Sequence, residues 1–415
     1  MFERRPLFGA LIVLTLVVTI WHMSLQEADS SSSSSGTTST VTGVQGDTQG
    51  MQGPSLLTHY SPHLAVAPPS SSYYFYALSK GGGGGVVGDD ASATTVDSWN
   101  QSSALGSLVN PVERLPKDDY TNLIDLKDFR FTINFSNCSS DSSERIKRDS
   151  LKSDERRSPL VLVLVHSAPT NWYKRNTIRD TWGQHDPRAK LVFLLGAVNS
   201  SILQRRIEQE NRMYDDIVQG SFLDAYRNMT YKHVMALKWF TYHCPEAKYI
   251  LKADDDVFVN TPALYDVLET ATQRRRLLFC QEIRKAPVKR THRSKWYVSI
   301  PEYRNKYYPS HCPGYSIIYT PDVAFLLYRE AQQQPYFWID DVHLTGTIAQ
   351  RINATITPTG SMLLNKSQKD AIIENKLNAT EQLFFFTTPD LRQGEIRQLW
   401  KAVTAARRSS SSSSR

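Results

Sequence analysis

The sequence predicts an α/β domain in which a mostly parallel sheet is flanked by helices. Two short apolar runs, 160–165 and 191–195, have the composition of strands that are buried on both faces. The residues between them, 175–182, have helical character, and a second helical stretch at 229–243 leads into a third apolar strand at 249–251. Strands that alternate with helices along the chain are typical of a parallel sheet between helical layers.

Further elements follow in the second half of the chain. Thr261-Pro262 marks the start of another helix, because proline suits the first helical turn. Two more apolar stretches, 277–279 and 316–319, are expected to be strands.

The composition divides the chain into unequal parts. Residues 26–110 contain long serine and glycine runs and cannot bury enough apolar surface to fold, so this part is expected to be a disordered stem. The charged residues 111–157 are expected to be a loosely packed segment before the compact domain, which we place at 158–404. A serine run makes 405–415 an expected disordered tail.

An apolar run at 7–23 is close to the minimum of about 17 residues for a membrane-spanning helix. Arg4 and Arg5 precede the run and no basic residue follows it closely, so the positive-inside rule places the first residues in the cytosol and the rest in the lumen. We therefore expect a cytosolic tail at 1–6 and a transmembrane signal-anchor at 7–25. A cleaved signal peptide, with an apolar region of about 7–15 residues, is the alternative.

A lumenal location agrees with two further features. Asparagine sequons occur at Asn100, Asn134, Asn137, Asn199, Asn228, Asn353, Asn365 and Asn378. The cysteines form an even set that allows three fully paired connectivities: Cys138, Cys244, Cys280 and Cys312. The net charge of +7 calls for anionic partners, but a lumenal domain does not meet nucleic acid, so a nucleic-acid-binding function is excluded.

Three adjacent carboxylates follow the third strand, at Asp254, Asp255 and Asp256. Adjacent carboxylates repel one another unless solvent or a cation neutralises them, and this turn lies between apolar stretches. Ligands of open α/β sheets bind beyond the carboxyl ends of the strands, and carboxylate oxygens suit hard cations that also hold phosphate groups. The turn therefore predicts a site for a metal ion and a phosphate, with a plain acidic surface turn as the alternative.

The acidic turn, continued by Val257, resembles the Asp-X-Asp signature of the β-1,3-galactosyltransferase and β-1,3-N-acetylglucosaminyltransferase family. Supporting motifs occur in the family's order at 175–182, 193–196, 208–230, 239–249, 295–299 and 308–315. The resemblance covers roughly 159–344. It implies a type II Golgi membrane protein with a GT-A-type nucleotide-sugar-binding domain, an inverting mechanism and Mn²⁺ as cofactor, with Mg²⁺ as the alternative.

The implied reaction moves a hexose from a UDP-sugar donor to a glycan acceptor on a glycoprotein or glycolipid, in a β-1,3 linkage. Galactose is the best candidate for the hexose, and N-acetylglucosamine and N-acetylgalactosamine are the alternatives. An inactive, membrane-tethered glycan-binding protein is the alternative from a different functional class. Two departures from the family pattern, at 312–315 and after Val342, leave the acceptor open.

The resemblance assigns roles to individual carboxylates. Asp256 is the first candidate metal ligand, Asp254 is a second ligand that also reaches the donor ribose, and Asp255 is expected to contact the donor sugar. Asp341 matches the second acid of the family's Glu-Asp-Val motif and is the candidate general base, with Asp340 orienting the acceptor. The structural alternative for both residues is a cap at a helix start.

Arg175 and Arg179 lie four residues apart and so share one helix face. Guanidinium groups suit phosphate recognition, and we assign both to the UDP end of the site. The alternative is an internal ion pair, for example with Asp180 or Asp224. Nearby, Trp182 is expected to pack in the core, and His166 to be an ordinary hydrogen-bonded histidine.

Overall fold

The computed structural model describes residues 111–135, 138, 158–271, 275–379 and 381–413. The predicted cytosolic tail, signal-anchor and stem lie outside these residues. Within the described ranges, no helix has both the length and the apolar character that crossing a membrane requires.

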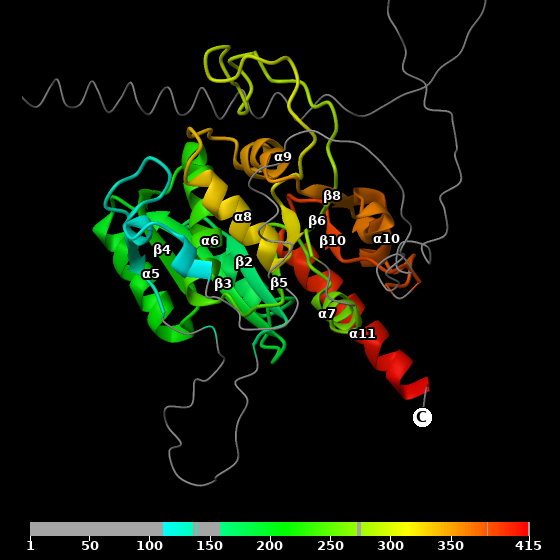
Figure 1. Ribbon diagram of the computed structural model, residues 1–415. Helices are drawn as coiled ribbons and strands as arrows, with labels where there is room; N and C mark the ends of the chain where they lie inside the picture. The colour runs from blue at the N-terminus through cyan, green and yellow to red at the C-terminus, as the bar shows by residue number, and fades with distance from the viewer. Residues whose placement is uncertain (1–110, 136–137, 139–157, 272–274, 380, 414–415) are drawn as a thin grey trace, which may run out of the picture. The chain divides into compact units, whose positions relative to one another are not determined.

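An eight-stranded sheet with the order β1-β4-β3-β2-β5-β7-β6-β8 forms the centre of the domain (Figure 1). Strands β4, β3, β2 and β5 run parallel, as do β6 and β8, whereas β1 and β7 pair antiparallel with their neighbours. The prediction of a mostly parallel sheet is therefore confirmed. The strands are β1 Phe131–Ile133, β2 Val161–His166, β3 Ala189–Ala197, β4 Ile217–Leu223, β5 Tyr249–Asp254, β6 Leu277–Cys280, β7 Ser316–Tyr319 and β8 Thr355–Pro358. Two short strands, β9 Leu363–Leu364 and β10 Phe386–Thr387, pair separately.

Helices cover both faces of the sheet. The α-helices are α4 Trp172–Arg179, α5 Ser201–Tyr214, α6 Met229–His243, α7 Thr261–Thr270, α8 Pro321–Ala331, α9 Ala349–Arg351, α10 Lys366–Ile373 and α11 Gln393–Ser413. The shorter turns of other helix types are η1 Pro111–Arg114, η2 Asp119–Thr121, η3 Tyr226–Asn228, the π-helical η4 Val342–Ile348 and η5 Gly360–Met362.

The two faces of strand β2 belong to two different cores. Leu162 and Leu164 pack with apolar residues of α6 and α8, whereas Val161, Val163 and Val165 pack with residues of α4, α7 and α11. Successive side chains of a strand point to opposite faces, so a wholly apolar run is what a strand covered on both faces requires.

The folded unit begins before residue 158. We expected a loosely packed segment at 111–157, but residues 111–135 contain η1, η2 and β1. Strand β1 extends the sheet by pairing with β4, and the turn η2 packs on α6. The ammonium group of Lys238 is buried there and donates hydrogen bonds to the carbonyl oxygens of Asp119 and Asn122. A buried ammonium is costly without acceptors, so these contacts hold residues 119–122 on the domain.

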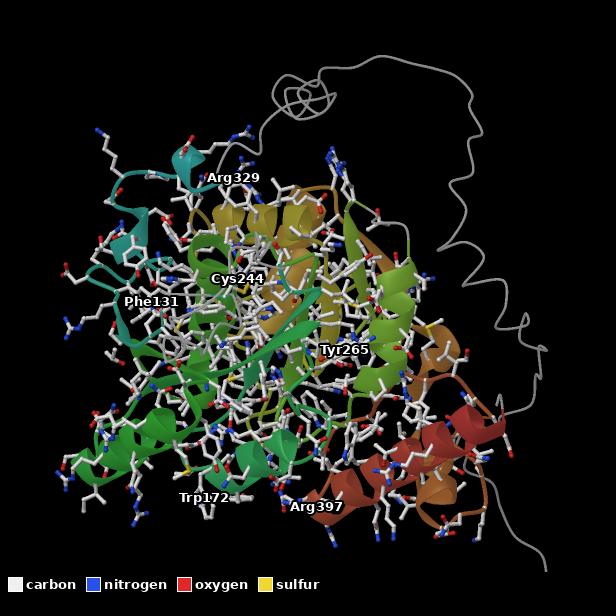
Figure 2. The ribbon with its side chains drawn as sticks, turned by 90° about the horizontal axis from the view of Figure 1, so that it is seen from below. Phe131, Trp172, Cys244, Tyr265, Arg329 and Arg397 are labelled. Carbon is white, nitrogen blue, oxygen red and sulfur yellow. A yellow bond between two sulfur atoms is a disulfide. The ribbon has the colours of Figure 1, made fainter. Side chains whose placement is uncertain are left out.

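The tail expected to be disordered at 405–415 is instead helical as far as Ser413, where α11 ends. Leu399 and Val403 are buried in the core, and Arg407 forms an ion pair with Asp266 at 2.7 Å. Helix propagation from such an anchored segment costs little, since each added residue also gains a backbone hydrogen bond. Nearer its start, α11 packs against α4, where Arg397 forms an ion pair with a residue at the end of that helix (Figure 2).

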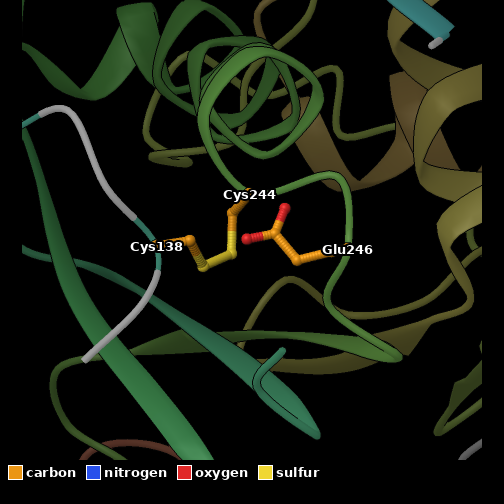
Figure 3. A group of neighbouring side chains, drawn as sticks. All are labelled: Cys138, Cys244 and Glu246. Carbon is orange, nitrogen blue, oxygen red and sulfur yellow. A yellow bond between two sulfur atoms is a disulfide. The ribbon is translucent and has the colours of Figure 1, made fainter. Parts of the chain in front are cut away.

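The cysteines form the disulfides Cys138–Cys244 and Cys280–Cys312, one of the three connectivities that the sequence allows. The first bridge ties the chain after β1 to the end of α6 and lies beside Glu246 (Figure 3). These three side chains have the proximity of a metal-binding group, but the two sulfur atoms are bonded to each other and offer no thiolate.

Candidate active site

The acidic turn lies at the carboxyl ends of two parallel strands. Asp254 ends β5 and pairs in register with His166, which ends β2. After the turn, Val257 is wholly buried and its carbonyl oxygen accepts a hydrogen bond from Trp182 Nε1 at 3.1 Å. The turn is therefore anchored on both sides, and the prediction that Trp182 packs in the core is confirmed.

Two distant parts of the sequence meet in one cavity of about 580 Å³. Asp254 and Asp256 line it from the acidic turn, and Asp340 and Asp341 line it from the residues before η4. The cavity thus brings together both candidate metal ligands and both candidate catalytic carboxylates. A further carboxylate, Asp390, also lines it.

Lys252 lies between the two carboxylate pairs. Its side chain is buried, and Nζ donates a hydrogen bond to Asp254 Oδ1 at 2.8 Å and another to the carbonyl oxygen of Gly314. Burial raises the pKa of Asp254 to about 6, although the positive charge of Lys252 opposes the shift. A Cβ atom at residue 314 would lie 3.2 Å from this Nζ, so glycine permits the close approach.

Asp256 is the more available of the two candidate metal ligands. Its side chain is 27% exposed, and the nearest cation, Lys174 Nζ, lies 3.6 Å away. Burial raises the pKa of Asp256, with Lys174 opposing the shift and the charge of Asp255 adding to it. Two carboxylates that share an open cavity fit Mn²⁺ or Mg²⁺, which take their other ligands from water and phosphate oxygens.

Asp255 does not face the cavity. Its carboxylate accepts hydrogen bonds from Ser167 Oγ at 2.7 Å, Asn171 Nδ2 at 2.9 Å and Lys174 Nζ at 2.8 Å. The residue therefore joins the acidic turn to the loop that precedes α4. In this arrangement its carboxylate oxygens are engaged by protein donors instead of a donor sugar.

Asp341 both caps a helix and lines the cavity, so the two roles considered for it are compatible. Oδ1 accepts a hydrogen bond from the N–H of Val342 at the start of η4, and Oδ2 accepts one from the N–H of Gly314 at 3.3 Å. Burial and the neighbouring charge of Asp340 raise the pKa of Asp341 to about 7. A carboxylate whose pKa lies near neutrality is suited to general-base catalysis.

Asp340 is held by a histidine that the sequence did not indicate. His233 of α6 lies with Nδ1 2.9 Å from Asp340 Oδ2 and Nε2 2.9 Å from the hydroxyl oxygen of Tyr319. Burial disfavours the charged carboxylate, but the hydrogen bond to His233 and the charge of Lys252 outweigh it and lower the pKa of Asp340. Of the two carboxylates, Asp340 therefore stays ionised more readily, and Asp341 binds a proton more readily.

His166 differs from the hydrogen-bonded histidine that we expected. Both ring nitrogens are buried and have no hydrogen-bond partner among the described residues, and the ring packs edge-on against His233 at 5.3 Å. Burial lowers the pKa of His166 well below its ordinary value, with the charge of Lys252 adding to the shift. The prediction was wrong because the ring is buried at the end of the strand, beside another imidazole and away from hydrogen-bond partners among the described residues.

Arg175 has the internal role that we considered as its alternative. All five N–H donors of its guanidinium group are used: two bond to Glu210 at 2.8 and 2.6 Å, and the others bond to Ser167 Oγ and to the carbonyl oxygens of Ala168 and Pro169. Its side chain is fully buried and does not line the carboxylate cavity.

Arg179 is likewise engaged inside the protein. It forms a two-point ion pair with Asp216, each contact 2.7 Å long, and a third contact with Glu210 at 2.8 Å. The partners are thus Glu210 and Asp216 instead of the expected Asp180 and Asp224. Contact with a diphosphate would require these ion pairs to break.

Aromatic side chains also form part of the wall of the cavity. Tyr226 and Trp338 lie with ring centroids 5.9 Å apart, and Trp296 also lines the cavity. Flat apolar rings with a polar edge suit the mixed surface of a sugar. Sequence signals exist for three of the lining residues that had no assigned role: Lys252 is a charged residue inside an apolar strand, and Tyr226 and Trp296 lie within the family motifs at 208–230 and 295–299. Asp390 carries no such signal and reaches the site through tertiary folding.

The chain is similar in sequence to known proteins over much of this domain. Residues 173–359 match the family described as Galactosyltransferase. The chain is 32% identical over 195 residues to beta-1,3-galactosyltransferase 1 of Mus musculus, a match that covers 46% of this chain and 60% of that protein. It is 32% identical over 200 residues to beta-1,3-galactosyltransferase 5 of Pan troglodytes, covering 47% of this chain and 67% of that protein.

The chain therefore spans about 60% of the length of the first of these curated relatives. Among solved structures, it is similar to the apo structure of the WbbM bifunctional glycosyltransferase, with 12% identity and a TM-score of 0.30, over 60% of this chain and 44% of that one.

Proposed function

Because this chain belongs to the β-1,3-galactosyltransferase family, we propose that it transfers galactose from UDP-galactose to a glycan hydroxyl group in a β-1,3 linkage. The observation that carries the proposal is the shared cavity of Asp254, Asp256, Asp340 and Asp341. This cavity offers a carboxylate pair for a cation and a second pair for proton transfer. A purely glycan-binding protein would need neither pair.

Asp341 acts as the general base. It takes the proton from the acceptor hydroxyl group while the hydroxyl oxygen bonds to the anomeric carbon of galactose, and the bond from that carbon to the diphosphate oxygen breaks. UDP leaves with the bonding electron pair, and attack from the opposite face inverts the configuration. Positioned general bases typically contribute about 10²–10⁴ in rate.

Asp256 and Asp254 would hold Mn²⁺, or Mg²⁺ in its place, at the diphosphate end of the cavity. A cation bound there supplies electrostatic stabilisation of the negative charge that develops on the leaving diphosphate. The Asp254 carboxylate is also paired with Lys252 at 2.8 Å, whereas the nearest cation to Asp256 lies 3.6 Å away. The Asp256 carboxylate is therefore the more available of the two to a metal ion.

Asp340 orients the acceptor beside the base. Its carboxylate is held in one position by His233, which is in turn bonded to Tyr319. A fixed, ionised Asp340 also raises the proton affinity of its neighbour through like-charge repulsion.

We infer that the reaction takes place in the Golgi lumen, with residues 7–25 as the membrane anchor of a type II protein. Support comes from the apolar run after Arg4 and Arg5 and from the two disulfides, which persist in oxidising compartments. The acceptor would then be a glycan on a glycoprotein or glycolipid.

A donor screen tests the function. The purified full-length chain is incubated with Mn²⁺ and UDP-galactose, UDP-N-acetylglucosamine or UDP-N-acetylgalactosamine, with a panel of glycan acceptors, and the product linkage is read by nuclear magnetic resonance. We expect transfer from UDP-galactose with a β-1,3 linkage. Preference for either N-acetylhexosamine donor would correct the donor, and binding of glycans without transfer from any donor would identify an inactive glycan-binding protein.

A further inference from the structure

The segment from Arg284 to Lys306, which contributes several lining residues to the carboxylate cavity, is strongly basic. It contains eight lysine and arginine residues and a single acidic residue, Glu302, which is already paired with Arg227 at 3.0 Å. Six of these basic side chains are exposed and form no ion pair with any residue that the structure describes: Lys285, Lys289, Arg293, Lys295, Arg304 and Lys306.

This basic segment has a defined structure of its own. The guanidinium group of Arg290 donates hydrogen bonds to four backbone carbonyl oxygens, at residues 298, 299, 303 and 305. Val288 and Val298 pack in a small core with Trp338 and Val342, the residue next to the candidate base. The backbone that bears the basic side chains is therefore ordered and packs against the residues beside Asp341.

Two of the unpaired cations, Lys289 and Lys295, line the same cavity as Asp341. Lys295 lies with Nζ 4.4 Å from the ring centroid of Trp296, another lining residue. Lys252, the third lysine of the cavity, is by contrast buried and paired with Asp254. The cavity thus has two ammonium groups that form no ion pair with any described carboxylate, next to an aromatic surface.

The placement of these two ammonium groups favours the acceptor over the donor. Asp254 and Asp256 are placed to hold a divalent cation, and the diphosphate of the donor would bind at that cation. Lys289 and Lys295 belong to the segment whose Val288 and Val298 pack against Trp338 and Val342, next to the candidate base. They are therefore placed for a group on the acceptor.

We propose that the acceptor is an anionic glycan whose sulfate, phosphate or carboxylate group binds Lys289 and Lys295 while its sugar ring lies against the aromatic wall. This inference rests on the proposed galactosyl transfer and specifies its substrate class. An anionic membrane surface is the competing occupant, but the two lysines line a sugar-sized cavity, which favours a glycan.

The test compares acceptors that carry an anionic group at C6 with neutral parents that lack it. Benzyl β-galactoside is compared with its 6-sulfate and with benzyl β-galacturonide, and benzyl β-N-acetylglucosaminide with its 6-sulfate. The two anionic forms of galactose distinguish a sulfate ester from a carboxylate. We expect kcat/KM to be roughly tenfold higher for an anionic acceptor than for its neutral parent. A tenfold change corresponds to about 1.4 kcal/mol, which two exposed ion pairs can supply together. Salt should reduce the preference, since the Debye length falls to about 3 Å at 1 M.

The double variant Lys289→Gln/Lys295→Gln should lose this preference while its KM for the UDP-sugar stays unchanged. The control, Lys127→Gln/Lys401→Gln, removes two exposed charges that do not line the cavity and should keep the preference. A wild-type enzyme that uses neutral and anionic acceptors equally would overturn the inference. A raised KM for the donor would do the same, because the lysines would then bind the diphosphate.

Calorimetric titration of the same glycosides, with UDP and Mn²⁺ present, separates this inference from the proposed function. Lysine-dependent binding of the anionic glycosides without transfer from any donor would refute the transferase activity and support the anionic subsite. Equal, weak binding of all glycosides would refute the subsite. Sedimentation with phosphatidylserine vesicles completes the test: lysine-dependent vesicle binding without an acceptor preference would show a membrane contact and overturn the inference.

Discussion

The ammonium group of Lys252 donates a hydrogen bond to Asp254 Oδ1 over 2.8 Å, and both residues belong to β5. Lys252 also donates to the carbonyl oxygen of Gly314, whose N–H donates to Asp341 Oδ2 over 3.3 Å. One buried ammonium group therefore connects the carboxylate at the proposed cation site with the proposed base. It also competes with a cation for Asp254.

Lys252→Met should show whether Lys252 competes with a cation for Asp254. The substitution leaves Asp254 without its hydrogen-bond donor Lys252, and we expect a loss of about 1–3 kcal/mol in the free energy of unfolding. Mn²⁺ should raise the melting temperature of the variant more than that of the wild type, because Asp254 becomes free to bind it. Lys190→Met, which removes a half-buried lysine away from the cavity, is the control. Equal Mn²⁺ effects in all three proteins would refute the competition.

Asp341→Asn should separate chemistry from binding. Asparagine keeps the size of the side chain but cannot accept the proton, so kcat should fall by about 10²–10⁴. UDP and Mn²⁺ should bind nearly as tightly as in the wild type, as measured by calorimetry beside the transferase assay. Near-normal turnover would show that the base lies elsewhere, and Asp340 would be the next residue to test.

Asp256→Asn should weaken donor binding and turnover together. The variant loses a carboxylate at the proposed cation site, and we expect UDP binding to lose its dependence on Mn²⁺. Calorimetric titration of UDP with Mn²⁺ and with EDTA measures this effect. If the wild type binds UDP equally well under both conditions, the proposed metal role is wrong.

The pH dependence of the reaction follows from the raised pKa of Asp341. With a pKa of about 7, the base is protonated in acid, so kcat/KM should rise with pH through about 7 and then level off. Stability should change in the opposite direction. A carboxyl group whose pKa is raised on folding stabilises the folded state below its unfolded pKa of about 4, and this contribution is lost as pH rises through about 7. Urea unfolding of Asp341→Asn should lack this loss, and an identical pH dependence in both proteins would contradict the assignment.

Arg175→Met should reduce stability without altering the donor site. The variant removes a fully buried partner of Glu210, which keeps its ion pair with Arg179, and losing a hydrogen bond to a charged group typically costs about 1.5–3 kcal/mol. The KM for UDP-sugar of the folded enzyme should not change. A higher KM for the donor together with normal stability would contradict this prediction and show that Arg175 contacts the donor.

Local patterns in the sequence were sufficient for the sheet and the acidic turn. Apolar runs at 160–165 and 191–195 predict strands buried on both faces, because only such strands exclude polar residues from both sides. The strands expected at 277–279 and 316–319 are also present. The tail at 405–413 was misjudged, because its helix depends on packing and ion pairs with residues distant in the sequence.

The tertiary structure alone decided how the candidate site is assembled. Arginines at helical spacing fit a phosphate or an internal carboxylate equally well, and only folding brought Glu210 and Asp216 within ion-pair distance. His233 lies within α6 and carries no local signal, yet it meets Asp340 across 107 residues of sequence. The sequence determined which chemical groups are available and where strands end. Which groups share a cavity depends on long-range packing, since contacts between distant segments leave no periodic pattern in either segment.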